Sequence, residues 1–353
     1  MNETPWNEAV RPEDEPEESG AGEAAHAGDS EPVETWQPET WPLVSPLAVF
    51  ESPFPAAEDR DVQREPPGTG PPLFQSWSQP EIYPPARIPH LGHVCLLAVF
   101  ALFGMLGAIL VTRSALHFHL FGISTVNQAI TDIHYALGSM AVIYLLTFCA
   151  CLVLFPIVWH KGFFAGLQWR GATALRLRKR LFGAALGCFL LALADEVLLP
   201  GPTNAPIDQF FQTSKEAWLL FAFGVTFAPF FEEIGFRGFL LPALCTAWDW
   251  AIEQSTGKPA RPLDSNGHPQ WSMFAMIGAS IATSVPFALM HAEQTAHALG
   301  PFLLLICVSL ILCWTRLASR SLAASVLVHS CYNFLLFSLM LLGTSGFKHM
   351  EKM

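Results

Sequence analysis

The sequence predicts an all-α membrane protein: a polytopic bundle of about seven or eight transmembrane helices, preceded by a disordered, acidic, proline-rich N-terminal tail. Three observations predict this class. Hydrophobic residues make up 52% of the 353 residues and charged residues only 14%, as is typical of membrane proteins. Several apolar stretches reach the roughly 20 residues that a helix needs to cross a bilayer. Most acidic residues and prolines lie in the first quarter of the chain.

Residues 1–92 form the tail. They hold 18 of the 30 acidic residues and 17 of the 28 prolines, but only four of the 19 lysines and arginines. Such a segment cannot bury enough apolar surface to offset the entropy of ordering, so we expect it to be disordered. Its charge also argues against a nucleic-acid partner. Its scattered aromatic residues leave open a protein partner for the tail: Trp36, Trp41, Phe50, Phe54, Phe74 and Trp77.

Residues 93–345 are predicted to form the transmembrane domain. Hydropathy indicates seven spans, and an eighth would arise if one long stretch were broken. The predicted spans are 94–112, 136–158, 181–199, 217–241, 272–292, 300–316 and 322–342. The eight cysteines lie within or beside these apolar stretches and include no Cys-x-x-Cys pair, so we expect neither disulfides nor a thiolate metal site.

The basic residues predict the orientation. The connection 159–180 holds six lysines and arginines and no acidic residue, so the positive-inside rule places it in the cytoplasm. It could be an interfacial helix on anionic lipid or an ordinary positively charged loop. The short link carrying Arg316 and Arg320 falls on the same side if the spans alternate. The N-terminus is then cytoplasmic and the C-terminus outside, and a bacterial inner membrane is the expected location.

The fourth predicted span contains three charges at its centre, Glu232, Glu233 and Arg237. An acidic or basic side chain there costs about 2.5–3.5 kcal/mol on insertion scales, so each needs a compensating role. Glu233 and Arg237 are spaced i, i+4 and can form an ion pair on one helix face. Glu232 is turned by about 100° from that face and has no partner on its own helix. Pro229 should kink the helix or open its hydrogen-bond ladder. The bland alternative is a structural ion pair with one spare acid.

Two later spans also carry polar side chains at i, i+4. One ends with Phe287 and His291, and the last contains His329 and Asn333. Each histidine alone could be an interhelical contact, and Asn333 could join two helices by a hydrogen bond. Polar groups within a membrane must, however, face the bundle interior or a water-filled cavity. We therefore expect them to meet Glu232.

These residue types suggest hydrolysis. A carboxylate and an imidazole can position and deprotonate water, while histidine and asparagine N–H groups stabilise an oxyanion. Alternatively, Glu232, His291 and His329 could hold a catalytic zinc ion with an open coordination position. The chain has neither a His-Glu-x-x-His nor a Gly-x-Ser-x-Gly sequence.

Three motifs, FEEIGFRGFLLPAL, FALMH and HSCYN, occur in this order on apolar segments. Together they resemble the CPBP intramembrane protease family, which comprises the type II CAAX prenyl endopeptidases and the bacteriocin-processing or Abi proteins. The resemblance covers roughly residues 180–342.

The resemblance implies a role for each polar residue of the three motifs. Glu232 and His291 would activate water, and His329 and Asn333 would form the oxyanion site. Glu233 would pair with Arg237 to hold the helix, with Phe287 as a further supporting residue. The family is often described as metalloproteases, yet a metal-free glutamate mechanism is also proposed for it. We prefer the metal-free mechanism, which needs no cofactor, and keep zinc as the alternative.

The expected activity is an endopeptidase that cleaves a membrane protein or a lipidated peptide near the surface of the lipid bilayer. The motifs do not say whether that substrate is prenylated. Two other functions stay open. One is a non-catalytic scaffold or bacteriocin-immunity protein of the same fold. The other is an ion-coupled transporter that uses Glu232 and Glu233 together with Asp195 and Glu196.

Overall fold

The computed structural model describes residues 87–199, 206–211, 213–264 and 267–347. All of them lie in the second of two units, 1–72 and 73–353, into which the chain divides. In the described residues helices dominate, and the extended pairing there is one isolated bridge between Leu263 and Pro269. Residues 1–86, which include nearly all of the expected disordered tail, lie outside the described residues.

Seven helical stretches are long and apolar enough to cross a membrane, as the sequence predicts. Six are single helices: α1 (Leu91–His117), α3 (Ile133–Trp159), α6 (Arg178–Leu198), α10 (Met273–Met290), α11 (Leu299–Ser319) and α12 (Leu322–Gly343). The other stretch, Ser214–Thr256, has 43 residues, about 65 Å of helix, and therefore extends beyond a bilayer core of roughly 30 Å. It is not broken, so the alternative of eight spans is not realised in the described part.

This long stretch consists of five segments in direct succession. They are α7 (Ser214–Ala222), the π-helix η4 (Phe223–Phe227), α8 (Ala228–Glu233), the π-helix η5 (Ile234–Leu240) and α9 (Leu241–Thr256). Thr213 caps its start, where it forms a capping box with Glu216. Gly257, with φ at +66°, ends it in the left-handed conformation that glycine tolerates best.

Five short helices lie between the spans. They are η2 (Leu120–Gly122), α2 (Val126–Thr131), α4 (Phe163–Gly166), α5 (Gly171–Arg176) and η3 (Pro206–Phe211). The basic connection 159–180 is therefore neither one interfacial helix nor a plain loop, because it contains both α4 and α5. At this end of the molecule Arg316 Nη1 donates to Gln168 Oε1 at 2.9 Å, and Ser321 Oγ donates to Arg170 O at 3.0 Å. The two basic connections thus lie at the same end of the bundle.

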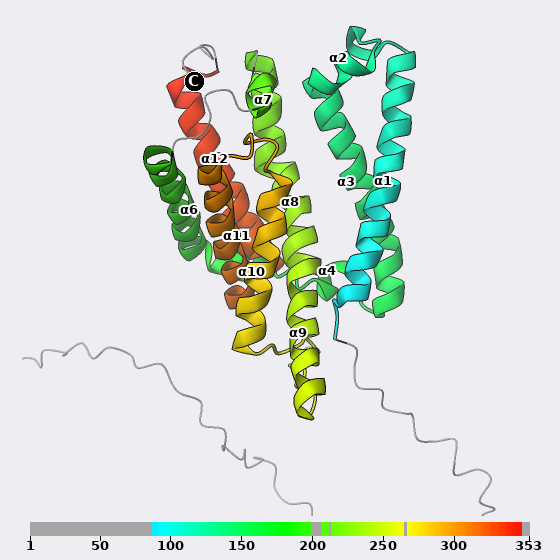
Figure 1. The fold of residues 1–353 in the computed structure, drawn as a ribbon, viewed down its shortest axis with the longest axis vertical. Helices are drawn as coiled ribbons and strands as arrows, with labels where there is room; N and C mark the ends of the chain where they lie inside the picture. Colours follow the sequence, from blue (N-terminus) through cyan, green and yellow to red (C-terminus); the bar gives the residue numbers. More distant parts are fainter. Residues whose placement is uncertain (1–86, 200–205, 212, 265–266, 348–353) are drawn as a thin grey trace, which may run out of the picture. The chain divides into compact units, whose positions relative to one another are not determined.

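The spans pack as two groups within this unit (Figure 1). α1 and α3 lie side by side. α1 contacts the long helix at η5 and α9, and α3 contacts it at α8 and η5 through aromatic rings. α6, α11 and α12 share an apolar core, and α9, α10 and α11 share another. The central charged segment α8–η5 therefore faces α1 and α3 on one side and α10 to α12 on the other.

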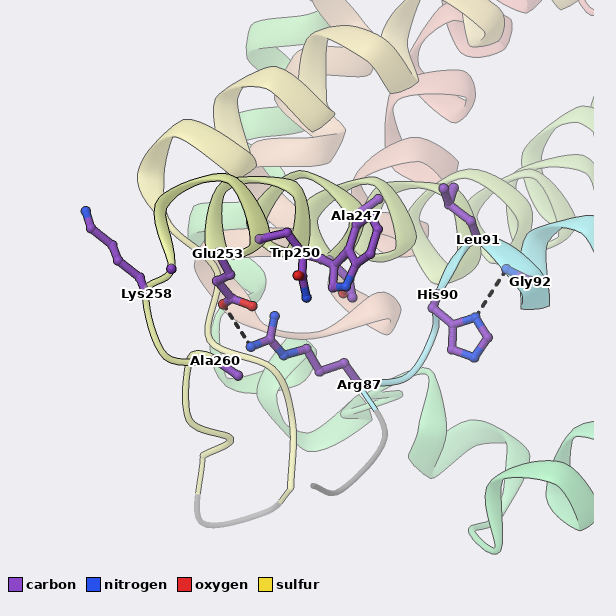
Figure 2. Close-up of a pocket in the computed structure, with 12 residues that line it drawn as sticks. Arg87, His90, Leu91, Gly92, Ala247, Trp250, Glu253, Lys258 and Ala260 are labelled. Atoms are coloured by element: carbon purple, nitrogen blue, oxygen red, sulfur yellow. Dashed lines mark hydrogen bonds and ion pairs between the residues drawn. The ribbon is translucent and has the colours of Figure 1, made fainter. Parts of the chain in front are cut away.

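The residues that precede α1 attach to the end of α9. Arg87 Nη2 donates to Glu253 Oε1 at 2.9 Å and to Arg261 O at 3.2 Å, and the first of these bonds is visible in Figure 2. His90 caps α1 by accepting a hydrogen bond from the Gly92 amide at 3.2 Å. Burial lowers the pKa of His90, which favours the neutral ring that this bond requires. The chain therefore enters the bundle at the end that holds the basic connections.

Candidate active site

Two π-turns flank the segment that carries the carboxylates. α8 ends at Glu233, between η4 and η5. A π-turn inserts one extra residue per turn and is frequent at functional sites. Each π-turn here is followed by a proline, Pro229 or Pro242. The π-turn and its proline together leave one backbone carbonyl without a hydrogen-bond donor from its own helix.

At the first π-turn the Ala228 amide donates to Phe223 O, five residues back. Pro229 has no N–H group to donate. The Gly224 carbonyl therefore lacks a donor from either following residue that could reach it within the helix. Asn333 Nδ2, from α12, donates to this carbonyl at 2.7 Å.

The second π-turn repeats the arrangement. The Leu241 amide donates to Phe236 O, and Pro242 again has no N–H. Arg316 Nε, from α11, donates to the released Arg237 carbonyl at 3.3 Å. Because an unpaired carbonyl in the bilayer interior is costly, these two side chains stabilise the π-turns.

Glu233 lies at the centre of a fully buried polar cluster. Its Oε1 accepts hydrogen bonds from Arg237 Nη1 at 2.9 Å and from His329 Nδ1 at 3.0 Å, and its side chain is 0% exposed. Arg237 Nη2 also donates to the Ser309 hydroxyl at 2.7 Å and to its carbonyl at 3.2 Å. The i, i+4 ion pair expected from the sequence is thus present, and it also orients His329.

Glu232 points the other way, towards two histidines. Its Oε2 lies 4.0 Å from His291 Nε2 and 3.9 Å from His329 Nε2. The three side chains are only 9%, 18% and 6% exposed, respectively. Both distances exceed the range of a direct hydrogen bond, yet one water molecule can bridge them.

The partners of the two Nδ1 atoms define the ring tautomers. His291 Nδ1 lies 2.9 Å from Phe287 O, which can only accept, so Nδ1 carries the proton. His329 Nδ1 likewise donates to the carboxylate of Glu233. In the neutral form of each ring, Nε2 therefore presents its lone pair towards Glu232.

Phe287 forms one wall of the cluster. Its ring centroid lies 4.5 Å from the Arg237 guanidinium, 4.9 Å from the His291 ring and 5.9 Å from the His329 ring. The side chain is 1% exposed. This ring keeps solvent away from the Glu233–Arg237 pair and fixes the spacing of the two imidazoles.

An apolar cavity of about 190 Å³ opens beside Glu232. It lies between the α1–α3 pair and the α8–η5 segment, and its lining includes Ala101, Tyr144, Phe148, Glu232, Phe236 and Met290. Glu232 is the charged residue of this lining. A larger cavity of about 670 Å³ lies elsewhere, at the junction of Arg87 with α9, and its lining does not include the carboxylate–histidine cluster (Figure 2).

The cluster does not fit zinc as it is arranged. Ligands of a tetrahedral zinc ion at 2.0–2.1 Å lie about 3.3 Å from one another. Glu232 Oε2 is 4.0 and 3.9 Å from the two histidine nitrogens. Among the described residues, no group of three or more His, Cys, Asp or Glu side chains is placed to hold a metal ion.

The structure brings together most of the candidate site residues from three separate spans. Glu232, His291 and His329 converge, and Asn333 lies one helical turn beyond His329, where it binds the backbone of η4. His291 is the C-cap of α10 rather than part of that helix. Asp195 and Glu196, named for a transporter, lie in the last turn of α6.

The sequence reasoning missed two kinds of residue. Ser309 and Arg316 bind the charged segment from α11, and side chains of α1 and α3 line the cavity beside Glu232. One signal was available for part of this. Pro229 and Pro242 are visible in the sequence, and each removes one amide donor from its helix, so a buried donor from another helix could be expected near each of them.

Comparison with known proteins gives one match. The family model described as Rce1-like, type II CAAX prenyl endopeptidase, matches residues 214–335, which contain all of the converging site residues. No curated protein and no solved structure matches the chain.

Proposed function

We propose that the protein, whose residues 214–335 match the Rce1-like family of type II CAAX prenyl endopeptidases, hydrolyses a peptide bond with a water molecule activated by Glu232 and His291. The seven candidate spans make it an integral membrane protein. The observation that carries the proposal is the approach of two Nε2 atoms to one carboxylate oxygen, at 4.0 and 3.9 Å.

The attacking water would sit between these groups. The Glu232 carboxylate and the neutral His291 ring both present acceptors, so a water between them donates its hydrogens to one or both and directs a lone pair outwards. On attack at the substrate carbonyl, the water proton passes to Glu232 or His291. The same proton can then reach the leaving amine, as general acid–base catalysis requires.

His329 and Asn333 would stabilise the oxyanion. For His329 to donate from Nε2 it must carry both ring protons, with Nδ1 still donating to the Glu233 carboxylate. Asn333 has two amide N–H groups, of which one is used by the Gly224 carbonyl. The other is available for the developing charge.

We propose that the substrate binds in the apolar cavity beside Glu232. Its lining comes from α1, α3, η5 and the end of α10, so an apolar group entering between these helices would bring its scissile bond to the carboxylate. We propose a membrane protein or a lipidated peptide as substrate. For the membrane, we propose a bacterial inner membrane with the N-terminus in the cytoplasm. The alternatives are a non-catalytic membrane scaffold or bacteriocin-immunity protein of the same fold, and an ion-coupled transporter. The following experiment tests the proposal against them.

Hydrolysis should be measured on purified protein with an internally quenched, lipidated peptide. We expect His291→Gln to lower kcat/KM by about 100-fold or more, the usual contribution of a general base. The matched control is His297→Gln, because His297 is an exposed histidine six residues further along. The control should cleave like the wild type. Cleavage that survives His291→Gln at the wild-type rate, in a folded protein, would overturn the proposal.

The same assay with a chelator distinguishes a metal-free mechanism from a zinc-dependent one. Until that result is known, the cofactor-free mechanism stays a prediction. We expect turnover to survive exhaustive treatment with a strong chelator, with no metal retained by elemental analysis. Loss of turnover that only added zinc restores would instead assign a metal to Glu232, His291 and His329.

A further inference from the structure

A third cavity, of about 720 Å³, lies on the outside of the bundle at the end that holds the basic connections. It is formed by the start of α10, the end of α11 and the loop before α10, whose positions Figure 1 shows. It shares no residue with the cavity beside Glu232. We call it the α10–α11 groove.

The inner end of this groove is cationic. Arg316 lines it and is only 3% exposed. Its guanidinium donates to Arg237 O, Gln168 Oε1 and Leu167 O, so three of its five N–H groups are used. No carboxylate of the described residues lies within 4.0 Å of it. A buried charge without a close counter-ion is costly, which points to an anion from outside the chain.

Arg320, His268 and Asp264 line the same end, so its two arginines outnumber its one carboxylate. Arg320 is 58% exposed and lies 3.6 Å from Asp264, a separation and exposure at which an ion pair contributes little. His268 is 9% exposed, and its Nδ1 has no hydrogen-bond partner among the described residues. Burial lowers the pKa of His268, and Arg170, Lys161 and Arg316 lower it further while Asp264 raises it. The ring is therefore a neutral donor or acceptor.

The outer half of the groove is apolar and faces away from the bundle. Ile277 and Ile281 stand one turn apart on α10 and are 54% and 55% exposed, and Trp314 on α11 is 69% exposed. Leu310 completes this wall. Exposed aliphatic side chains on a membrane-spanning helix contact acyl chains, and tryptophan is enriched at the level of lipid headgroups.

We propose that the α10–α11 groove is a binding site for an anionic phospholipid. The phosphate lies against Arg316 and Arg320 with His268 as a further donor, and an acyl chain runs along Ile277 and Ile281. A soluble acidic peptide would match the cationic end alone, whereas a phospholipid matches both halves. The site also reaches the catalytic segment, because Arg316 binds the carbonyl of Arg237 in η5.

Binding of phosphatidylglycerol should be measured on the purified full chain by native mass spectrometry, with phosphatidylcholine as the neutral lipid. The test variant is Arg320→Glu, since Arg320 is exposed and makes no bond inside the bundle core. The matched control is Arg178→Glu, an exposed arginine of the same basic end that does not line the groove. We expect Arg320→Glu to weaken phosphatidylglycerol binding by about tenfold, with no loss for phosphatidylcholine. The control should bind like the wild type.

A second variant, Ile281→Asp, tests the apolar half and should weaken both lipids while leaving the melting temperature within a few degrees of the wild type. Equal weakening by Arg320→Glu and Arg178→Glu would show unspecific attraction to a basic surface and overturn the proposal. So would undiminished binding in both groove variants, or equally tight binding of glycerol phosphate without acyl chains. None of these readouts depends on peptide cleavage.

Discussion

At the scale of single residues, two adjacent glutamates divide the work of the site. Glu233 is wholly buried and binds Arg237 and His329 through one carboxylate oxygen. Glu232 faces the two Nε2 atoms and the apolar cavity. The first carboxylate holds the arrangement together, and the second is left for chemistry.

This division predicts a large loss of stability when Glu233 alone is neutralised. Glu233→Gln leaves the Arg237 guanidinium buried without its counter-charge, which costs roughly 3–5 kcal/mol in comparable pairs. The double variant Glu233→Met with Arg237→Met removes both charges and should be less destabilised than the single variant. Thermal unfolding in detergent measures both. A single variant that melts with the wild type would show that the pair does not stabilise the bundle.

Part of this residue-level picture could be read from the sequence. The Glu233–Arg237 pair follows from its i, i+4 spacing. The bond from His329 to Glu233 could not be predicted, because it depends on the rotation and depth of α12 against α8. The sequence placed His291 late and His329 early in their spans, and only the packed helices show that both reach Glu232.

At the scale of elements, the two π-turns decide where the carboxylates point. Each adds one residue to a turn, which rotates the following helix by about 100° relative to an unbroken α-helix. Pro229 and Asn333 together hold the first turn, and Pro242 and Arg316 the second. The sequence predicted a kink or an interrupted series of helical hydrogen bonds at Pro229. It did not predict π-turns, because their register depends on donors from other helices.

The Pro229→Ala variant tests this role. The new amide can donate to Val225 O, the carbonyl four residues back, so the helix can relax to α and turn Glu232 away from the histidines. We expect kcat/KM to fall by roughly 100-fold, the size of effect that a displacement of about 1 Å produces, although Pro229 does not line the cavity beside Glu232. Pro156→Ala is the control, since Pro156 also lies inside a helix, α3, but far from the carboxylates in the chain.

Turnover is measured as the initial rate of cleavage of one peptide, with the same concentration of folded protein for each variant. If Pro229→Ala and Pro156→Ala cleave equally well, the register set by the first π-turn does not control the site.

At the scale of the whole molecule, hydropathy predicted the seven spans because a bilayer requires long apolar helices regardless of their packing. It underestimated the length of the fourth, which continues to Thr256 as α9. Hydropathy predicts neither the α10–α11 groove nor the cavity beside Glu232, because both arise only where separate helices meet.

The orientation of the bundle follows from its basic end. Lys161 and Arg320 lie at this end, and Phe118 follows α1 at the other. By the positive-inside rule, cysteines placed at 161 and 320 should react with a membrane-impermeant reagent only in inverted vesicles, and one at 118 only in intact cells. Labelling is scored against the wild-type chain with its eight cysteines. The reverse pattern would invert the orientation, and labelling of 161 and 320 from opposite sides would contradict the fold.

The most direct measurement is the turnover of Glu232→Gln, compared with that of Glu293→Gln, since Glu293 is an exposed acid in the turn after α10. Glutamine keeps the size of Glu232 and removes its charge and its capacity to take a proton. We predict a loss of at least about 100-fold in kcat/KM with an unchanged melting temperature, while Glu293→Gln cleaves normally. A folded Glu232→Gln protein that cleaves at the wild-type rate would contradict the assignment of this carboxylate as the base.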